Sequence, residues 1–280
     1  MKLDFTKMHG CGNDYIYVNG FELDFEKAIK VKLAKTLSDR HFGIGADGLI
    51  FINPSSVADF EMEMYNADGS RAEMCGNGIR CVAKYVYDRK MVNKEEFVIE
   101  TMGNRKIINV SVKDGLVETV RVDMGAPILK PELIPVVSLD ETFIDNPVNI
   151  DGKTYKMTCV SMGNPHAVIF HNPEDVLSLG PFVENNSIFP KRVNAEFVEI
   201  LDRKNVRMRV WERGTGETLC CGTGCCATTV ACILNGYTDN EITVHVPGGK
   251  IDVLWNKEDN HIYMTGPATT VFDGSVEIEV

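Results

Sequence analysis

Two stretches of the chain alternate charged and apolar residues, and each leads into a polar turn, a cysteine and an apolar run. The stretches are FEMEMYN at 60–66 and VRMRVWE at 206–212, and a period of two is typical of a half-buried strand. Cys75 and Cys221 follow, each in the pattern Cys-Gly-x-Gly. Apolar residues then recur at helical spacing in IRCVAKYVYD, whereas CCATTVACILNG is apolar nearly all round up to Gly236. We therefore predict a helix after each cysteine, the second one buried on every side.

This repeat extends well beyond the cysteines. MHGCGND, which contains Asn13, has a counterpart in SMGNPH, which contains Asn164. RHFGIGADG at 40–48 corresponds to RVNAEF at 192–197, and VDMGAP corresponds to MTGPAT. Alternating segments follow each cysteine helix, namely FVIETMGNRKIINVSV with VRVDMG, and EITVHVPGGKIDVLW with HIYMTG. The sequence thus predicts a duplicated α+β unit, with several antiparallel strands around one central helix in each half.

One further helix is expected in each half. The first spans about Asp24 to Ser38, with Asp24 as its N-cap and Ile29, Leu33 and Leu37 on one face. The second spans about 174–179, where Pro173 favours a helix start and Gly180 favours a stop. The Pro-bearing segment 127–147 is the expected connector between the halves.

Bulk composition limits the possible partners. Lys and Arg total 29 and Asp and Glu total 40, so the net charge is −11. Such a chain repels nucleic acid and anionic membrane surfaces, and we expect neither as a partner. The N-terminus lacks the apolar core of a signal peptide, and no apolar run has the length of a membrane span. We expect a cytoplasmic protein.

The nine cysteines are an odd number in a chain without a secretion signal, so a disulfide framework is not expected. Free cysteines are commonly buried core residues. We interpret Cys81, Cys159, Cys225, Cys226 and Cys232 in that way. Cys221 and Cys225 have the spacing of half a zinc site, but no CxxC or nearby His completes four ligands, and we expect no metal.

Cys75 and Cys221 differ from the others because each stands at a predicted helix start. Backbone N–H groups and the helix dipole stabilise a thiolate there and lower the pKa of a cysteine. The following glycines leave N–H groups open to a carboxylate. With one thiolate and one thiol on opposite faces of an amino-acid Cα, a proton could leave one face and arrive at the other, which needs no bound cofactor.

At this point the motifs resemble those of the diaminopimelate epimerase family. The similarity covers nearly the whole chain: MHGCGNDY, GIGADG, NADGSRAEMCGNGIRC, SMGNPHAV, RVNAEF, ERGTGETLCCGTG and GPATTVFDG occur in the family's order. The resemblance implies an isomerase that converts LL-2,6-diaminopimelate to the meso isomer without a cofactor, in lysine and peptidoglycan precursor synthesis. It also implies an α+β fold of two pseudo-symmetric domains, each an antiparallel strand barrel around a central helix, and a homodimer. Because the final strand returns to the first domain, the expected domains are 1–119 with 266–280, and 120–265.

The resemblance also implies site residues. Cys75 and Cys221 match the two bases, and His166 and Glu212 match residues that tune the thiols. The matched substrate contacts are Asn13, Asn66, Asn164 and Asn194, the α-carboxylate loops Gly76–Asn77 and Gly222–Thr223, and Glu212 with Arg213 for the distal amino-acid end. Asn66 and Ala67 in the first half stand where Glu212 and Arg213 stand in the second, and this asymmetry favours one particular stereocentre.

Some positions depart from the family pattern. Cys220 stands where many members have Ala, although the following Gly-Thr-Gly favours Cys221 as the base. Cys11, Cys225 and Cys226 are further thiols close to the motifs. Gly48 occupies a position where some members carry a side-chain amide, so that contact is in doubt.

Two other interpretations remain. A related enzyme of the same fold could act on proline, although CGNG with Asn77 and the ERGTGET run argue against this. A thiol-redox or metal-binding protein is the alternative from another class. The glycines of GIGADG do not fit a nucleotide-binding GxGxxG, and no βαβ pattern surrounds them.

Overall fold

The computed structural model describes residues 1–23, 25–72 and 74–279. The chain forms two compact units, Met1–Val122 with Gly266–Val280, and Asp123–Thr265. It passes between them within β8 (Leu116–Gly125) and again within β17 (Ile262–Pro267). The segment 127–147 therefore belongs to the second unit and is not the connector, because strand β8 itself carries the chain across.

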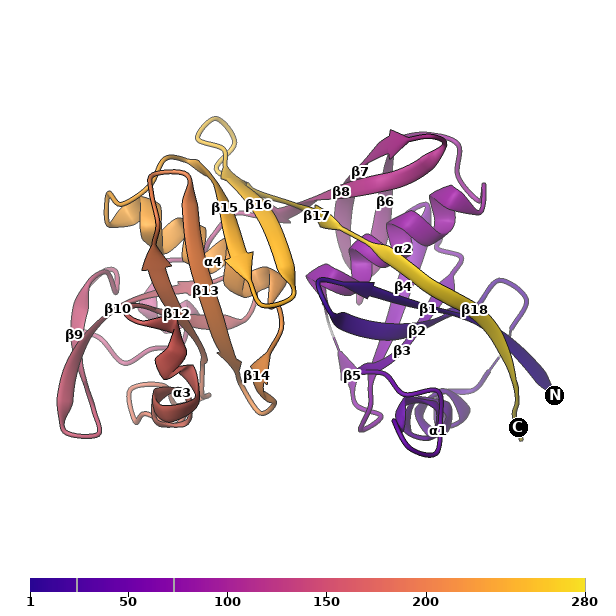
Figure 1. The fold of residues 1–280 in the computed structure, drawn as a ribbon, viewed down its shortest axis with the longest axis horizontal. Helices are drawn as coiled ribbons and strands as arrows, with labels where there is room; N and C mark the ends of the chain where they lie inside the picture. Colours follow the sequence, from indigo (N-terminus) through magenta and orange to yellow (C-terminus); the bar gives the residue numbers. More distant parts are fainter. Residues whose placement is uncertain (24, 73, 280) are drawn as a thin grey trace. The chain divides into compact units, whose positions relative to one another are not determined.

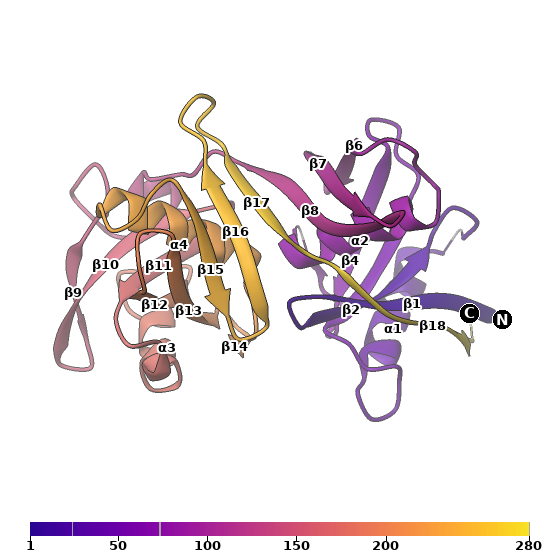
Figure 2. The same ribbon diagram turned by 45° about the horizontal axis from the view of Figure 1, so that its top comes forward.

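The first unit is one curved sheet around helix α2 (Gly76–Asp88). Its hydrogen-bonded order is β18–β1–β2–β3–β4–β6–β7–β8, with the short β5 on β4, and only the neighbours β2–β3 and β4–β6 are parallel among the described pairs. The strands are β1 (Lys2–Gly10), β2 (Asn13–Asn19), β3 (Gly48–Asn53), β4 (Phe60–Asn66), β5 (Arg71–Ala72), β6 (Glu96–Thr101), β7 (Asn104–Lys113), β8, and β18 (Thr269–Glu277). β18 lies along β1 near the chain ends, as Figures 1 and 2 show. Helix α2 contacts β1, β2 and β7, so strands from separate parts of the sheet meet on it.

The second unit repeats this arrangement around helix α4 (Gly222–Leu234). Its order is β9–β10–β11–β12–β13–β15–β16–β17, with the short β14 on β13. The strands are β9 (Asn146–Ile150), β10 (Lys153–Ser161), β11 (Pro165–Phe170), β12 (Asn194–Ile200), β13 (Asn205–Glu212), β14 (Gly216–Thr218), β15 (Glu241–Val246), β16 (Gly249–Trp255) and β17. The parallel neighbours β11–β12 and β13–β15 occupy the positions of β2–β3 and β4–β6. The duplicated α+β unit predicted from the sequence is confirmed. The expectation of purely antiparallel strands is wrong, because each unit contains two parallel pairs.

Strand register fixes which residues correspond between the units. Tyr15 pairs with Gly48, and His166 pairs with Asn194. Leu49 pairs with Tyr65, and Ala195 pairs with Trp211. Asn66 and Glu212 therefore occupy the same place at the end of β4 and β13, as the sequence repeat predicts.

The two cysteine helices have the predicted character. Helix α4 is buried over almost its whole length and ends at Asn235 and Gly236, where Gly236 has a φ of 74°. Helix α2 carries a fully buried arginine, Arg80, among its apolar residues. No helix in the described residues has the length and apolar character needed to cross a bilayer.

The outer helices depart from expectation. Helix α1 (Lys27–Ser38) buries Leu33 and Leu37 as predicted, but Glu26 holds its N-cap position, and the expected cap Asp24 lies outside the described residues. Helix α3 (Val176–Glu184) follows a 3-10 turn at Pro173–Asp175 and does not stop at Gly180. A Cβ at Gly180 would lie 2.6 Å from the Cβ of Trp211, so this glycine allows close packing and does not end the helix.

Candidate functional site

The first half-site is the start of helix α2, where Cys75 is the N-cap residue. Cys75 has extended backbone angles, and its Sγ accepts a hydrogen bond from the Gly78 N–H at 3.3 Å. The Sγ–H donates to Oδ1 of Asn13 at 3.2 Å. Asn13 is brought there by the β1–β2 turn, where Cys11 and Gly12 both have positive φ. Two residues predicted from the sequence, Cys75 and Asn13, are thus in direct contact.

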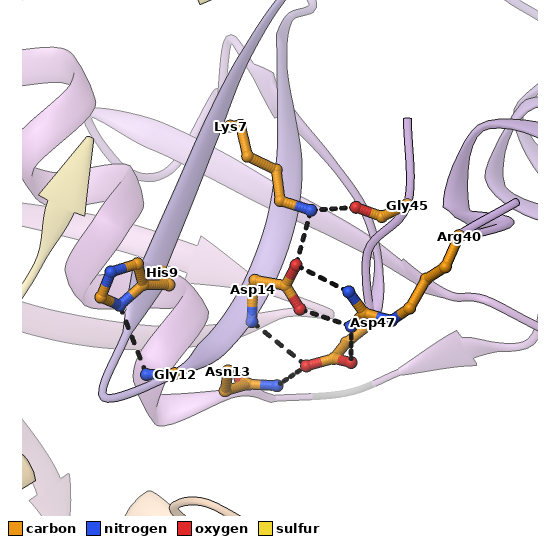
Figure 3. A network of polar contacts seen from close by, with 8 residues as sticks. All are labelled: Lys7, His9, Gly12, Asn13, Asp14, Arg40, Gly45 and Asp47. Carbon is orange, nitrogen blue, oxygen red and sulfur yellow. Dashed lines mark hydrogen bonds and ion pairs between the residues drawn. The ribbon is translucent and has the colours of Figure 1, made fainter. Parts of the chain in front are cut away.

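Charged residues hold the Asn13 side chain (Figure 3). Its Nδ2 donates to Oδ2 of Asp47 at 2.7 Å, and the Asp14 N–H donates to the same oxygen. Arg40 bridges the carboxylates of Asp47 and Asp14, at 2.9 Å and 2.7 Å. Lys7 pairs with Asp14 and also donates to the Gly45 carbonyl. Arg40, together with Lys7, holds the pKa of Asp14 below its usual value, although burial opposes this.

The loop at Gly76–Asn77 is held from inside the unit. Oδ1 of Asn77 accepts from Nη2 of Arg80 at 2.7 Å, and the Gly76 carbonyl accepts from Nη1 at 3.0 Å. Nε of Arg80 donates to the Pro267 carbonyl at 3.1 Å. A buried guanidinium therefore lies under the first turn of α2, where it adds to the positive helix end. The Asn77 side chain fixes this loop through Arg80.

Asn66 ends β4 in the turn that its sequence predicts. Its Nδ2 donates to Oγ of Ser70 at 3.0 Å, and its backbone N–H donates to the Ser70 carbonyl. The neighbouring Ala67 N–H donates to the Asp47 carbonyl. Asp47 thus bonds to the Asn13 side chain and to the backbone of Ala67, the residue after Asn66.

The second half-site is the start of helix α4, with Cys221 at the N-cap. Its Sγ lies 3.4 Å from Oγ1 of Thr223. Cys221 is 6 % exposed, and burial raises the pKa of its thiol well above the usual value, with the Glu212 and Glu196 carboxylates adding to the rise. The helix start was expected to lower this pKa. That expectation is wrong for Cys221, because burial and two nearby carboxylates outweigh the helix end.

A chain of polar contacts leads from Cys221 through the half-buried Thr223 and Asn164 into the interior of the second unit. Nδ2 of Asn164 donates to Oγ1 of Thr223 at 3.2 Å, and its Oδ1 lies 3.0 Å from Nε2 of His166. Nδ1 of His166 lies 2.7 Å from Oε1 of Glu196. Both His166 and Glu196 are fully buried. His166 contacts Cys221 through Asn164 and Thr223, whereas Asn13 contacts Cys75 directly.

Glu212 and Arg213 point to different surroundings. Glu212 accepts from the Thr218 hydroxyl and contacts Cys221, and burial raises the pKa of its carboxyl. The Arg213 backbone N–H donates to Oδ1 of Asn194 at 2.8 Å, and its guanidinium donates to the Lys191 carbonyl. The structure therefore connects Arg213 with Asn194, and Glu212 with the thiol.

The remaining positions of interest are structural in character. All nine cysteines are free thiols, and Cys220 is 2 % exposed. A Cβ at Gly48 would lie 2.2 Å from the Tyr65 carbonyl, so a side chain there would collide with β4. In the part of the chain that the structure describes, no three His, Cys, Asp or Glu side chains are grouped so as to hold a metal ion.

Sequence reasoning missed four residues that contact the half-sites: Tyr15, Asp47, Arg80 and Glu196. Glu196 and Arg80 had a local signal, since each is a charge among apolar residues of a buried element. Tyr15 corresponds to His166 by strand register, and Ile50 corresponds to Glu196. The polar His–Glu pair is thus specific to the second unit.

Comparisons with known proteins agree with this duplicated architecture. The model of the family described as diaminopimelate epimerase matches residues 5–130 and 158–271. A diaminopimelate epimerase of Acetivibrio thermocellus is 57 % identical over 277 residues, covering 98 % of both chains, and one of Methanococcus maripaludis is 53 % identical over 279 residues, covering 99 % of this chain and all of that one. Among solved structures, a probable proline racemase from Agrobacterium radiobacter has a TM-score of 0.73 at 15 % identity, covering 99 % of this chain and 93 % of that one. A Bacillus anthracis phenazine biosynthesis protein has a TM-score of 0.67 at 18 % identity, covering 99 % and 100 %. These two structures share the fold, which confirms the predicted fold class.

Proposed function

The chain belongs to the diaminopimelate epimerase family, and on that premise we propose that it converts LL-2,6-diaminopimelate to the meso isomer. The observation that carries the proposal is the presence of one thiol at the start of the central helix of each unit, each linked to a matching asparagine. Such an isomerase serves lysine and peptidoglycan precursor synthesis.

The proposed chemistry uses Cys75 and Cys221 as the two bases. One thiolate removes the α-proton from one face of the substrate carbon, and the other cysteine, as a thiol, delivers a proton to the opposite face. The reverse reaction exchanges these roles. Backbone N–H groups at Gly76–Asn77 and Gly222–Thr223 bind the α-carboxylate and stabilise the charge that develops during transfer. No cofactor takes part in this scheme.

The substrate contacts follow from the matched motifs. We assign the four asparagines Asn13, Asn66, Asn164 and Asn194 to polar groups of the substrate, and Glu212 with Arg213 to its distal amino-acid end. His166 acts at a distance, because its ring is linked to the thiol through Asn164 and Thr223. Glu212 also tunes Cys221, which is consistent with its effect on the pKa of that thiol.

We further propose a homodimer in the cytoplasm. Nine free thiols suit a reducing compartment. A net charge of −11 disfavours nucleic acid and anionic membranes as partners.

Chiral chromatography of LL-diaminopimelate incubated with the purified protein tests the proposal. Wild-type protein should form the meso isomer, while Cys75→Ser and Cys221→Ser should each lose most of this activity. Cys220→Ala is the matched control, because the neighbouring thiol should not be needed. Faster turnover of proline than of diaminopimelate would overturn the substrate assignment, and stoichiometric zinc in the active protein would count against the two-thiol chemistry.

A further inference from the structure

The orientation of the Asn13 amide is set by the charged residues behind it. Nδ2 of Asn13 lies 2.7 Å from Oδ2 of Asp47, and a carboxylate can only accept a hydrogen bond. The Asp47 carboxylate is itself held by Arg40 at 2.9 Å and by the Asp14 N–H at 3.1 Å. The NH2 group of Asn13 therefore faces Asp47, as Figure 3 shows, and its carbonyl oxygen faces the Sγ of Cys75.

That oxygen determines which form of Cys75 is favoured. Oδ1 of Asn13 lies 3.2 Å from Sγ and has no hydrogen to donate, so it attracts an S–H and repels a thiolate. We propose that Asp47 is a positioning residue that fixes the Asn13 carbonyl toward Cys75 and thereby holds Cys75 as a thiol in the resting protein. The inference deepens the two-base chemistry proposed above and rests on it for its meaning in the reaction, since each cysteine donates a proton as a thiol and accepts one as a thiolate.

Other groups around Cys75 act differently. The Gly78 N–H donates to Sγ and favours the thiolate. The Tyr15 hydroxyl contacts both Cys75 and the Asn13 side chain. Tyr17 and Cys81 are further titratable groups close enough to interact with Cys75. Lys7, Asp14 and Arg40 interact with Asp47 or its neighbours and not with the Asn13 amide. Asp47 is the residue of this charged cluster whose side chain contacts the amide.

The second unit does not orient its asparagine amide in this way. There the Asn164 amide donates to Thr223, and its oxygen faces His166 in place of the thiol. The residue that corresponds to Gly48, next to Asp47, is Asn194, which bonds to the Arg213 backbone. The hold of Asp47 on the Asn13 amide thus distinguishes Cys75 from Cys221 within a duplicated fold.

The test is the pH dependence of iodoacetamide alkylation, measured separately at Cys75 and Cys221 by peptide mass spectrometry without substrate. In Asp47→Ala the freed amide can turn its N–H toward sulfur, so the alkylation midpoint of Cys75 should fall by about one pH unit while that of Cys221 stays unchanged. Asp47→Asn keeps an acceptor for Nδ2 and should behave as wild type. Asp14→Asn is the matched control, because it breaks the neighbouring ion pairs and leaves the hydrogen bond between Asn13 and Asp47 in place.

An unchanged midpoint in Asp47→Ala, or an equal fall in Asp14→Asn, would overturn the assignment. If Asp47→Ala does not fold, Asn13→Ala removes the same oxygen and should lower the Cys75 midpoint in the same direction, whereas no change there would overturn it too. Because alkylation needs no substrate, these outcomes are independent of whether the protein epimerises diaminopimelate.

Discussion

Glu212→Gln should make Cys221 more acidic. Glu212 lies against this thiol at the end of β13, and its carboxylate is the largest contribution after burial to the raised pKa of Cys221. Glutamine has nearly the same shape and can still accept from the Thr218 hydroxyl, so the substitution removes a charge and little else.

The size of the effect follows from the electrostatics of a partly buried pair. Two unit charges about 4 Å apart interact by about 4 kcal/mol at an effective dielectric constant of about 20, which is close to three pKa units. Neighbouring charges commonly shift a pKa by about one to three units. Since burial also raises the pKa of Glu212, and so reduces its charge, we expect a fall near the lower end of this range.

The assay is alkylation of Cys221 by iodoacetamide across a pH series, read by peptide mass spectrometry. The midpoint for Cys221 should move to lower pH in Glu212→Gln by about one unit or more. Glu199→Gln is the control, because Glu199 is exposed on β12 and paired with Arg207. A midpoint for Cys221 that stays unchanged or rises in Glu212→Gln would refute the reasoning.

Two further predictions address stability. Burial raises the pKa of Cys81 to about 11, whereas a thiol in the unfolded chain has a pKa of about 8.5. As the pH rises, the unfolded chain therefore loses this proton before the folded protein does. The free energy of unfolding should fall above pH of about 8.5, by about 1.4 kcal/mol at pH of about 9.5. Other buried thiols with a raised pKa, such as Cys221, also contribute to the alkaline loss. In urea titrations at neutral and alkaline pH, the loss in Cys81→Ala should therefore be smaller than in wild type by about 1.4 kcal/mol at pH of about 9.5, and an equal loss in both proteins would reject the assignment. Gly180→Ala should cost about 1–3 kcal/mol, because its Cβ would meet Trp211 at 2.6 Å; calorimetry should show a Tm lower by several degrees than in Leu177→Ala on the exposed face, and equal Tm values would contradict this packing.

Much of the architecture could be predicted from local sequence signals. The period of two at 60–66 and 206–212 and the Cys-Gly-x-Gly repeats depend on short stretches of chain, and the strands and helices at these places are confirmed. The correspondence of Asn66 with Glu212 also follows from the repeat, because both residues end the strand before the cysteine turn.

The features that were missed depend on contacts between distant parts of the chain. Asp47 reaches Asn13 across 34 positions, and His166 reaches Glu196 across 30. Glycine is a residue typical of a helix end, but Gly180 lies inside helix α3 because Trp211 packs closely against it. The raised pKa of Cys221 depends on burial, which no local pattern at a helix start reports.

The central claim is that two thiols act on opposite faces of one carbon, and isotope incorporation in deuterated water tests it most directly. LL-diaminopimelate is incubated with the protein, and product and remaining substrate are analysed by mass spectrometry at low conversion. Two bases predict meso product with solvent deuterium at the inverted carbon in nearly every molecule, while the unreacted LL isomer keeps its protium. Meso product that retains the original protium at that carbon would show a single base carrying the same proton across, and would contradict the account.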